Sequence, residues 1–339
     1  MPMTRKYSIE QLGDIPLLQD DLATLYSWSV VNNQDYNQKK FESMSYSSSG
    51  MKSLYFDPSH GPIQSKEHVK DLGVTFSADA TFNKHIDIIT GKARTLSGWM
   101  LRTFQSRNKE VMLTLLRQLI IPTVEYCCPV WSPGDSFNIN KLEKIQRSFT
   151  KHIVGMHEVH YWDRLAQLHL YSLQRRRERY MIIYIWKIIQ GLVPDVGLAY
   201  APTNNNDHIK LKLPHLNGPA HIKKLMESSL LYHGARLYNN LPGELRSTSN
   251  PEEAVSVDTF KRRLDQFIKL MPDEPGPNKD NRIRPAESNS LMHQMAFQRT
   301  VTILNCAPKS GSSRAGKRSR AHASEKTSGW KMARSRWDD

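Results

Sequence analysis

The chain has 339 residues, 39% of them hydrophobic, which is enough for one large domain or two ordinary ones with a real core. Its formal net charge of +14 favours a polyanionic partner, because clustered lysines and arginines release counterions condensed on phosphates. Nucleic acid is the first candidate and an anionic membrane surface the second. The three cysteines, Cys127, Cys128 and Cys306, disfavour both a disulfide framework and a zinc site built from spaced thiolates.

Signals for membranes or secretion are not seen in the sequence. No stretch approaches about 18 consecutive apolar residues, the length of a transmembrane helix. Residues 1–14 lack the apolar run of a signal peptide. We therefore expect an intracellular protein, nuclear or cytoplasmic, that is not secreted and has no membrane partner.

The first 80 residues are predicted to form a small α/β unit. Leu18, Leu22 and Leu25 recur at helical spacing, which predicts an amphipathic helix over 15–29. Two short apolar runs, Ser53–Phe56 and Val69–Phe76, predict strands.

After Phe82 the hydrophobic period is helical for about two hundred residues. Asn108 is typical of an N-cap and Pro122 of a helix end, whereas residues 195–228 are predicted to be a long connection. The predicted helices are Lys84–Phe104, Glu110–Ile121, Asn138–Val154, Trp162–His169, Leu173–Gln190, Leu230–Tyr238 and Phe260–Leu270.

Residues 273–339 have the composition of a disordered basic tail. Between Lys309 and Trp337 there are nine basic residues and one acidic residue, with hardly any aliphatic side chains. The run Lys317–Arg320 fits a nuclear-import or nucleic-acid patch, or a read-through end with no role. The predicted fold is therefore mainly α: a small α/β part over 1–80, a helical part over 81–272 and a disordered basic tail.

Several motifs resemble one known family. Leu18–Ser29, with the sequence LQDDLATLYSWS, resembles the helix after the catalytic hairpin in jockey-like and CR1-like reverse transcriptases. Tyr36–Met44 is a variant of the next family segment without its second Trp and its Cys. Val69–Phe76, followed by Thr81–Ile86, resembles the K-D-L-G-V strand and the F-x-x-H-I helix start that close the palm and open the thumb.

Two longer motifs follow in the same order. Ile120–Pro133 resembles the family's P-x-L-E-Y-C-S-P-V-W-S-P, and Leu142–Lys151 resembles its L-E-x-V-Q-R-R-F-T-K. The resemblance covers roughly residues 15–270. It implies the palm edge, the thumb and the downstream part of a reverse transcriptase from a non-LTR retrotransposon.

The resemblance implies a polymerase whose palm aspartates hold two Mg²⁺ ions for an in-line displacement. The aromatic-Ala-Asp-Asp turn of the family is missing from Met1–Asp14. Asp20 and Asp21 lie within a helical period, where neighbouring side chains diverge by about 100°. We therefore expect no catalytic residue, no metal ligand and no cofactor in this chain, which is predicted to be inactive alone.

The same resemblance implies thumb helices that contact the phosphates of a template and primer duplex. We expect weak, non-specific binding of RNA or DNA. The candidate residues are Lys70, Lys144, Arg147, Lys151, Arg175, Arg176, Arg177 and Arg179.

Each candidate has a plainer alternative. Lys70 fits an edge strand that merely packs, and the basic face of 138–154 fits an ordinary solvated helix. Arginines at the start of a helix oppose its macrodipole and need compensating charges if they do not face phosphates. Tyr126–Trp131 favours packing over a base-stacking platform, and His152, His157 and His160 lack a fourth metal ligand.

A hypothesis from a different class is a domesticated helical module that binds proteins. In that case the apolar helix faces and Trp131, Trp162 and Trp186 would serve unknown protein partners. Salt separates the two hypotheses, because phosphate binding weakens steeply with salt and apolar association does not.

Overall fold

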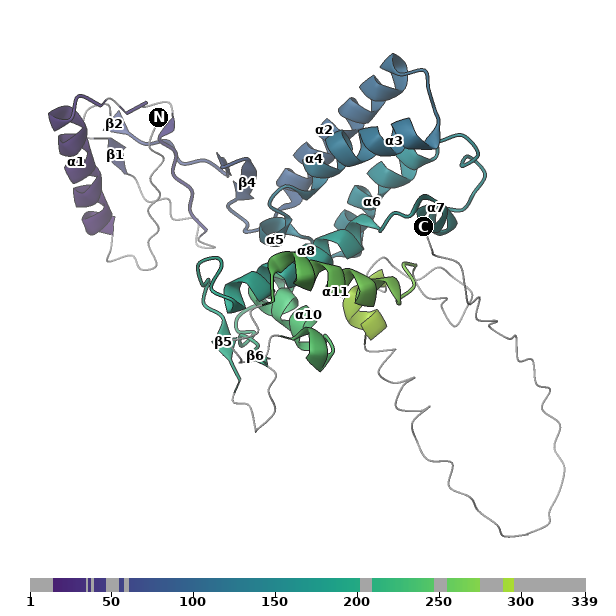
Figure 1. The fold of residues 1–339 in the computed structure, drawn as a ribbon. Coiled ribbons are helices and arrows are strands. Elements are labelled where there is room, and N and C mark those ends of the chain that lie inside the picture. Colours follow the sequence, from purple (N-terminus) through teal and green to yellow (C-terminus); the bar gives the residue numbers. More distant parts are fainter. Residues whose placement is uncertain are drawn as a thin grey trace, which may run out of the picture. The chain divides into compact units, whose positions relative to one another are not determined.

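The computed structural model describes residues 15–34, 36–37, 40–46, 55–57, 61–201, 209–246, 255–274 and 289–295. Within these ranges the fold is mainly helical, with three small two-stranded antiparallel sheets (Figure 1). The predicted fold class is confirmed. Most of the predicted tail, residues 275–288 and 296–339, lies outside the described residues.

The elements up to residue 131 begin with one helix and two hairpins. They are α1 (Ile15–Val31), β1 (Phe56–Asp57), β2 (Gly61–Pro62), β3 (His68–Asp71), β4 (Val74–Ser77), α2 (Asn83–Thr103), α3 (Lys109–Leu115), the π-helix η3 (Leu116–Ile120), α4 (Ile121–Glu125) and α5 (Cys128–Trp131). The later elements are α6 (Ser136–Thr150), α7 (Tyr161–Leu168), α8 (Leu173–Ile189), β5 (Ala199–Tyr200), β6 (Leu211–Lys212), α9 (Ala220–Ser228), η4 (Leu230–Gly234), α10 (Ala235–Asn239), η5 (Gly243–Leu245) and α11 (Val257–Lys269).

The run Val69–Phe76 forms two strands and not the single strand that its apolar pattern predicts. It turns at Leu72 and Gly73, whose φ angles are +44° and +91°. Two successive residues with positive φ make the kind of two-residue turn that joins antiparallel strands, so β3 pairs with β4. Strand β4 packs against α2, and its residues Val74, Thr75 and Ser77 are buried.

Pro122 does not end the helix that begins at Lys109. The π-helical segment η3 precedes it, and Ile121 N donates to Leu116 O across this wider turn. Proline is tolerated in the first turn of a helical segment because its missing N–H is not needed there. The chain therefore continues as α4 to Glu125, with Tyr126 as its C-cap, and Cys127, with φ of +53°, is the N-cap of α5.

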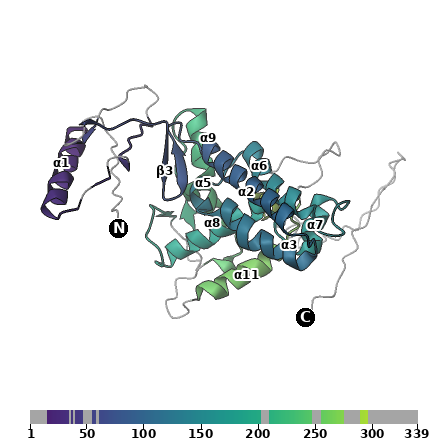
Figure 2. The ribbon, with the colours of Figure 1, turned by 90° about the horizontal axis from the view of Figure 1, so that it is seen from above.

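Two hydrophobic clusters organise the described helices. The first runs from Val74 to Leu173 and the second from Met181 to Met295. The long helix α8 contributes to both, with the α2–α6 group on one side and α10 and α11 on the other (Figures 1 and 2). Trp186 of α8 stacks on Phe260 of α11, with ring centroids 4.5 Å apart, which fixes the second cluster against the helix.

The predicted connection over 195–228 holds more structure than expected. It contains the short hairpin β5–β6 and the helix α9. Leu211 is 2% exposed, and its backbone N–H and C=O bond to the side-chain amide of Asn239 at 2.9 Å and 2.8 Å. Contacts with α10, 28 residues further along the chain, therefore hold β6 in place.

Within the region predicted as tail, residues 289–295 are described and packed. Leu291 is fully buried and Met295 is 2% exposed, both within the second cluster. The sequence pattern did not predict this packed segment, because Leu291 and Met295 lie in a region whose composition is mostly polar.

Among the described residues, no helix combines the length and the apolar content that crossing a membrane requires.

The packing predicts a large effect for Leu142→Ala. This side chain is fully buried in the first cluster, so its removal should leave a cavity and lower the free energy of unfolding by about 2–5 kcal/mol. The control Leu192→Ala removes a side chain that is 55% exposed and should change stability by less than about 0.5 kcal/mol. Urea unfolding followed by circular dichroism measures both, and equal decreases would contradict this placement of the core.

Candidate nucleic-acid interface

Three of the predicted binding residues lie on one exposed face of α6. Lys144 and Arg147 lie within the helix, Lys151 is its C-cap, and all three are exposed. Their spacing of three and four residues places them in one row along about 10 Å of helix. The opposite face, including Leu142 and Phe149, is buried in the first cluster, so the row points away from the core.

Arg147 has a partly fixed orientation. Its guanidinium carbon lies 4.6 Å from the centre of the Tyr161 ring, and its backbone carbonyl accepts a hydrogen bond from Arg164 (2.9 Å). A cation held over an aromatic ring loses less conformational freedom when an anion binds. Lys144 and Lys151 have no ion-pair partner within the part of the chain that the structure describes.

Lys70 lies apart from the α6 row, exposed on strand β3. Two contacts fasten its hairpin to the helices. His85 of α2 accepts a hydrogen bond at Nδ1 from Thr75 N (3.2 Å), and the hydroxyl of Tyr126 donates to Leu72 O (3.1 Å). Burial, with Lys92 nearby, lowers the pKa of His85, which favours the neutral ring that this bond requires.

The helices α2 and α6 lie side by side and run parallel. Asn138 donates to Asn83 Oδ1 at 2.7 Å, and one turn further along each helix Lys141 pairs with Asp87. These two pairs join the hairpin end of the molecule to the helix that carries the basic row.

Sequence reasoning missed the basic residues of α2. Their signal was available, because they fall opposite the buried positions of a helical period. The exposed ones are Lys84, Lys92, Arg94 and Arg102.

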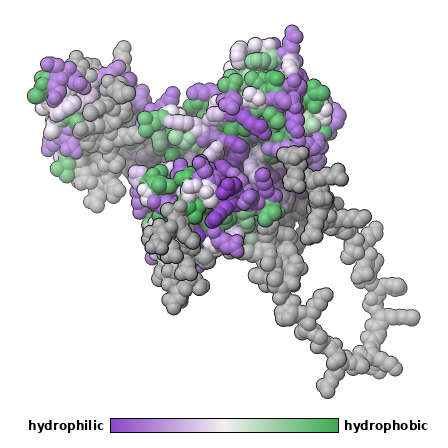
Figure 3. Space-filling view, in the orientation of Figure 1, coloured by the Kyte–Doolittle hydropathy of each residue, from purple (hydrophilic) through white to green (hydrophobic). Residues whose placement is uncertain are grey.

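Exposure alone does not define the interface. Figure 3 shows hydrophilic and apolar residues mixed over the face of the molecule seen in Figure 1. The candidate surface is therefore defined by the regular row on α6 and by the neighbouring helix α2, and not by one uniform patch.

The arginines at the start of α8 are either enclosed in the protein or paired with its carboxylates. Arg175 and Arg177 are each 1% exposed, so neither guanidinium is open to a phosphate in this arrangement. Arg175 donates to the backbone carbonyls of Met271 (2.7 Å) and Pro272 (2.6 Å), and Asp273 lies 3.4 Å from its Nε.

Arg176 and Arg179 form two-pronged pairs with carboxylates. Arg176 bonds Glu125 through Nε (2.5 Å) and Nη2 (2.9 Å), and Arg179 bonds Asp265 in the same way at 2.5 Å and 2.7 Å. Asp273 supplies a further negative charge at the helix start, where it accepts from Ser172 N (2.6 Å). These acids give the compensation that arginines at a helix N-terminus require.

A buried polar layer surrounds Arg177. Glu143 of α6 is 3% exposed, accepts a hydrogen bond from Tyr161 and accepts Leu173 N at 3.1 Å. Burial raises the pKa of Glu143, although Tyr161 and Arg177 oppose this change, and burial lowers the pKa of Arg177. This layer joins α6 to α8 between the two hydrophobic clusters.

The aromatic residues divide between core and surface. Trp131 and Trp186 are 1% and 2% exposed, and Trp162 packs against the first cluster. Tyr126 is 57% exposed, but its hydroxyl is used by the hairpin tip. Within Tyr126–Trp131 only Cys128 and Trp131 are buried, whereas Tyr126, Cys127 and Val130 are exposed. The buried tryptophans offer little surface to a partner.

In the described ranges, no three His, Cys, Asp or Glu side chains converge as a metal site would require. His157 pairs with Glu158 at the surface. Asp20 and Asp21 are both exposed on α1.

Comparison with known proteins finds distant relatives. An uncharacterised protein of Caenorhabditis elegans is 26% identical over 134 residues, which make up 38% of this chain and 68% of that protein. A probable RNA-directed DNA polymerase from the transposon X-element of Drosophila melanogaster is 26% identical over 97 residues, or 28% of this chain. The match spans 11% of that polymerase. No family model and no solved structure matches the chain.

These findings relate part of the chain to a transposon reverse transcriptase. The share of the polymerase that is matched is too small to carry its activity over to this chain.

The buried position of Glu143 predicts a distinctive pH dependence for Glu143→Gln. A carboxyl whose pKa is raised in the folded state stabilises the protein below its unfolded pKa, near 4.3, and this contribution disappears as pH rises through the folded value. The glutamine variant does not titrate, so its stability relative to the native chain should rise with pH. The rise should be about 1.4 kcal/mol for every pH unit between the unfolded and folded pKa values. Unfolding in urea between pH 4 and 8 measures the difference.

The matched control is Glu67→Gln, which changes an exposed acid. Its stability relative to the native chain should stay flat over the same pH range. A flat line for Glu143→Gln as well would refute the raised pKa.

Proposed function

We propose that this chain corresponds to the palm edge, thumb and downstream part of a jockey-like or CR1-like reverse transcriptase and binds RNA or DNA without sequence preference. The distant match to a transposon polymerase supports the family, and the order of motifs over residues 15–270 supports the region. The observation that carries the binding proposal is the exposed row of Lys144, Arg147 and Lys151 on α6.

The geometry favours contact with a phosphate backbone over contact with bases. The row consists of flexible cations on a regular helix, and its position is fixed by the packed face beneath it. Such residues hold a duplex in register without reading its sequence. Lys70, on a hairpin fastened to α2, supplies a separate contact.

Catalysis is not part of the proposal for this chain alone. The family's aromatic-Ala-Asp-Asp turn is not found in the sequence, and Asp20 and Asp21 both lie on the exposed side of one helix. The Mg²⁺ ions that such polymerases use would need carboxylates that converge from neighbouring strands. We propose that the chain is inactive as a polymerase and takes no cofactor.

A binding titration tests the proposal. Fluorescence anisotropy of a labelled RNA–DNA hybrid should show binding by the full chain that weakens strongly between 50 and 200 mM salt. The triple variant Lys144→Gln, Arg147→Gln, Lys151→Gln should bind more weakly. The slope of log affinity against log salt should shrink by about 0.9 for each phosphate that the variant no longer neutralises.

The matched control replaces three exposed lysines away from α6, in Lys210→Gln, Lys212→Gln, Lys269→Gln. It removes the same charge and should keep the native salt slope. Equal weakening in both triple variants would mean that the α6 row contributes only through the overall positive charge of the protein, and not as a specific contact surface. Binding that does not respond to salt would instead favour the protein-interaction module.

A further inference from the structure

The start of α8 and residues 271–274, which follow α11, form a surface, called the groove below, against which a separate segment of the chain packs. Residues 289–295 lie in it and bury Leu291 and Met295 in the second hydrophobic cluster. These two side chains stand four residues apart on one helical turn, so they enter the cluster from the same side. Apolar burial thus supplies one half of the recognition.

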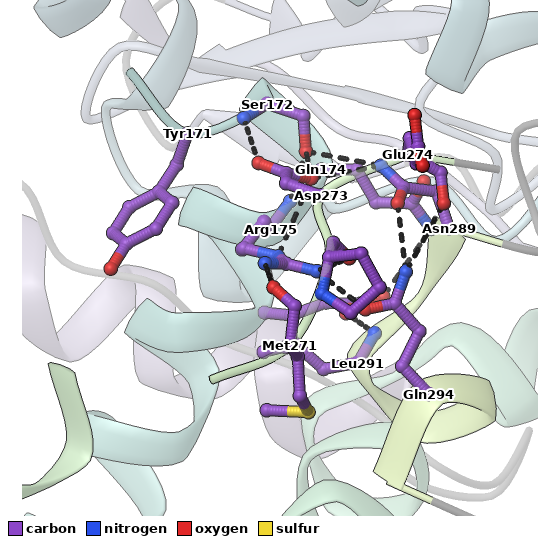
Figure 4. A network of polar contacts seen from close by, with 12 residues as sticks. Tyr171, Ser172, Gln174, Arg175, Met271, Asp273, Glu274, Asn289, Leu291 and Gln294 are labelled. Atoms are coloured by element: carbon purple, nitrogen blue, oxygen red, sulfur yellow. Dashed lines mark hydrogen bonds and ion pairs between the residues drawn. The ribbon is translucent and has the colours of Figure 1, made fainter. Parts of the chain in front are cut away.

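Polar contacts supply the other half (Figure 4). Asn289 is 1% exposed and donates to Asp273 Oδ1 (3.0 Å) and Ser172 Oγ (3.3 Å). Leu291 N donates to a carboxylate oxygen of Glu178 at 2.6 Å, and Gln294 Oε1 accepts from Arg175 Nη2 at 2.6 Å. A buried polar group discriminates strongly, because a ligand that leaves it unpaired incurs its full desolvation cost.

The polar side chains that line the groove are also held by hydrogen bonds and ion pairs that do not involve the segment. Asp273 accepts from Ser172 N and Oγ, at 2.6 Å and 2.8 Å. The guanidinium of Arg175 is also bound by the carbonyls of Met271 and Pro272. Glu178 has Gln174 (3.3 Å) and His233 (3.6 Å) beside its other oxygen. A site prepared in this way loses little conformational freedom when its ligand docks.

The chain reaches the groove through fourteen residues, 275–288. The two ends of this connection meet, because Asn289 bonds Asp273, and Gln294 Nε2 donates to Glu274 O at 3.3 Å. The contacts of the segment with Asp273 and Glu274 therefore bring the two ends of the connection together. A short link of this kind raises the local concentration of a ligand without adding to its recognition.

We propose that this groove is a peptide-binding site whose ligand is the chain's own segment 289–295, recognised through Asn289, Leu291, Gln294 and Met295 as a separable unit. The site is distinct from the basic row on α6 and stands whether or not the chain binds nucleic acid. A peptide of a different chain with the same pattern, Asn-x-Leu-x-x-Gln-Met, competes for it.

Cutting the connection in the full chain tests separability. A site for a sequence-specific protease replaces residues 279–285, and the purified protein is cut and passed over a sizing column at low micromolar concentration. The C-terminal piece should remain bound to the helical piece. In the Leu291→Asp variant it should separate, because a carboxylate cannot occupy a fully buried apolar position.

A labelled peptide of residues 287–297 separates recognition from folding. It should bind the uncut Leu291→Asp chain, whose own segment leaves the groove open. The same peptide carrying Leu291→Asp should bind roughly 100-fold more weakly or worse. A peptide with His293→Ala, which changes an exposed residue, should bind like the native peptide. Separation of the native pieces after cutting, or equal binding of the Leu291→Asp peptide, overturns the proposal.

Discussion

The structure depends on burying the polar first half of α8 between two hydrophobic clusters. Arg175, Arg177 and Glu178 are each less than 5% exposed, a position that charged groups occupy only when paired. Contacts to this half of the helix come from both sides: Glu143 of α6 accepts a hydrogen bond from Leu173 N, and Asp273, which follows α11, lies beside Arg175. Each partner thus ties a distant segment to one helix. The relative placement of the two clusters follows from this layer.

The same layer decides which basic residues are left for a partner. Arg176 and Arg179 are engaged by Glu125 and Asp265, and the two arginines on the inner face are enclosed. Lys144, Arg147 and Lys151 have the opposite surroundings, since the acid of α6, Glu143, is buried. The exposed row on α6 is therefore the surface for which we propose contact with a phosphate backbone.

A connection also exists between this layer and the C-terminal segment. Arg175 donates both to the carbonyl of Met271 and to Gln294 of the segment, and Glu178 accepts a hydrogen bond from Leu291 N of the segment. Polar groups shared in this way make docking selective, because a wrong segment leaves them unpaired. The row proposed to bind nucleic acid, on α6, and the site proposed to bind the peptide, beside α8, thus use different residues of one helical body.

The sequence by itself determined the helices whose hydrophobic period is long, such as α2, α6 and α8, and the outward face of α6. Local periodicity decides these features, since a helix buries its apolar side in any fold. Only the tertiary structure decided which groups pair with Arg175, Arg176 and Arg179 of α8, because the carboxylates that bind them lie 51 to 98 residues away in the chain. It also decided the order in 209–228 and the docking of 289–295, whose local patterns are weak. Contacts between distant segments stabilise these elements, and no short window of sequence records such contacts.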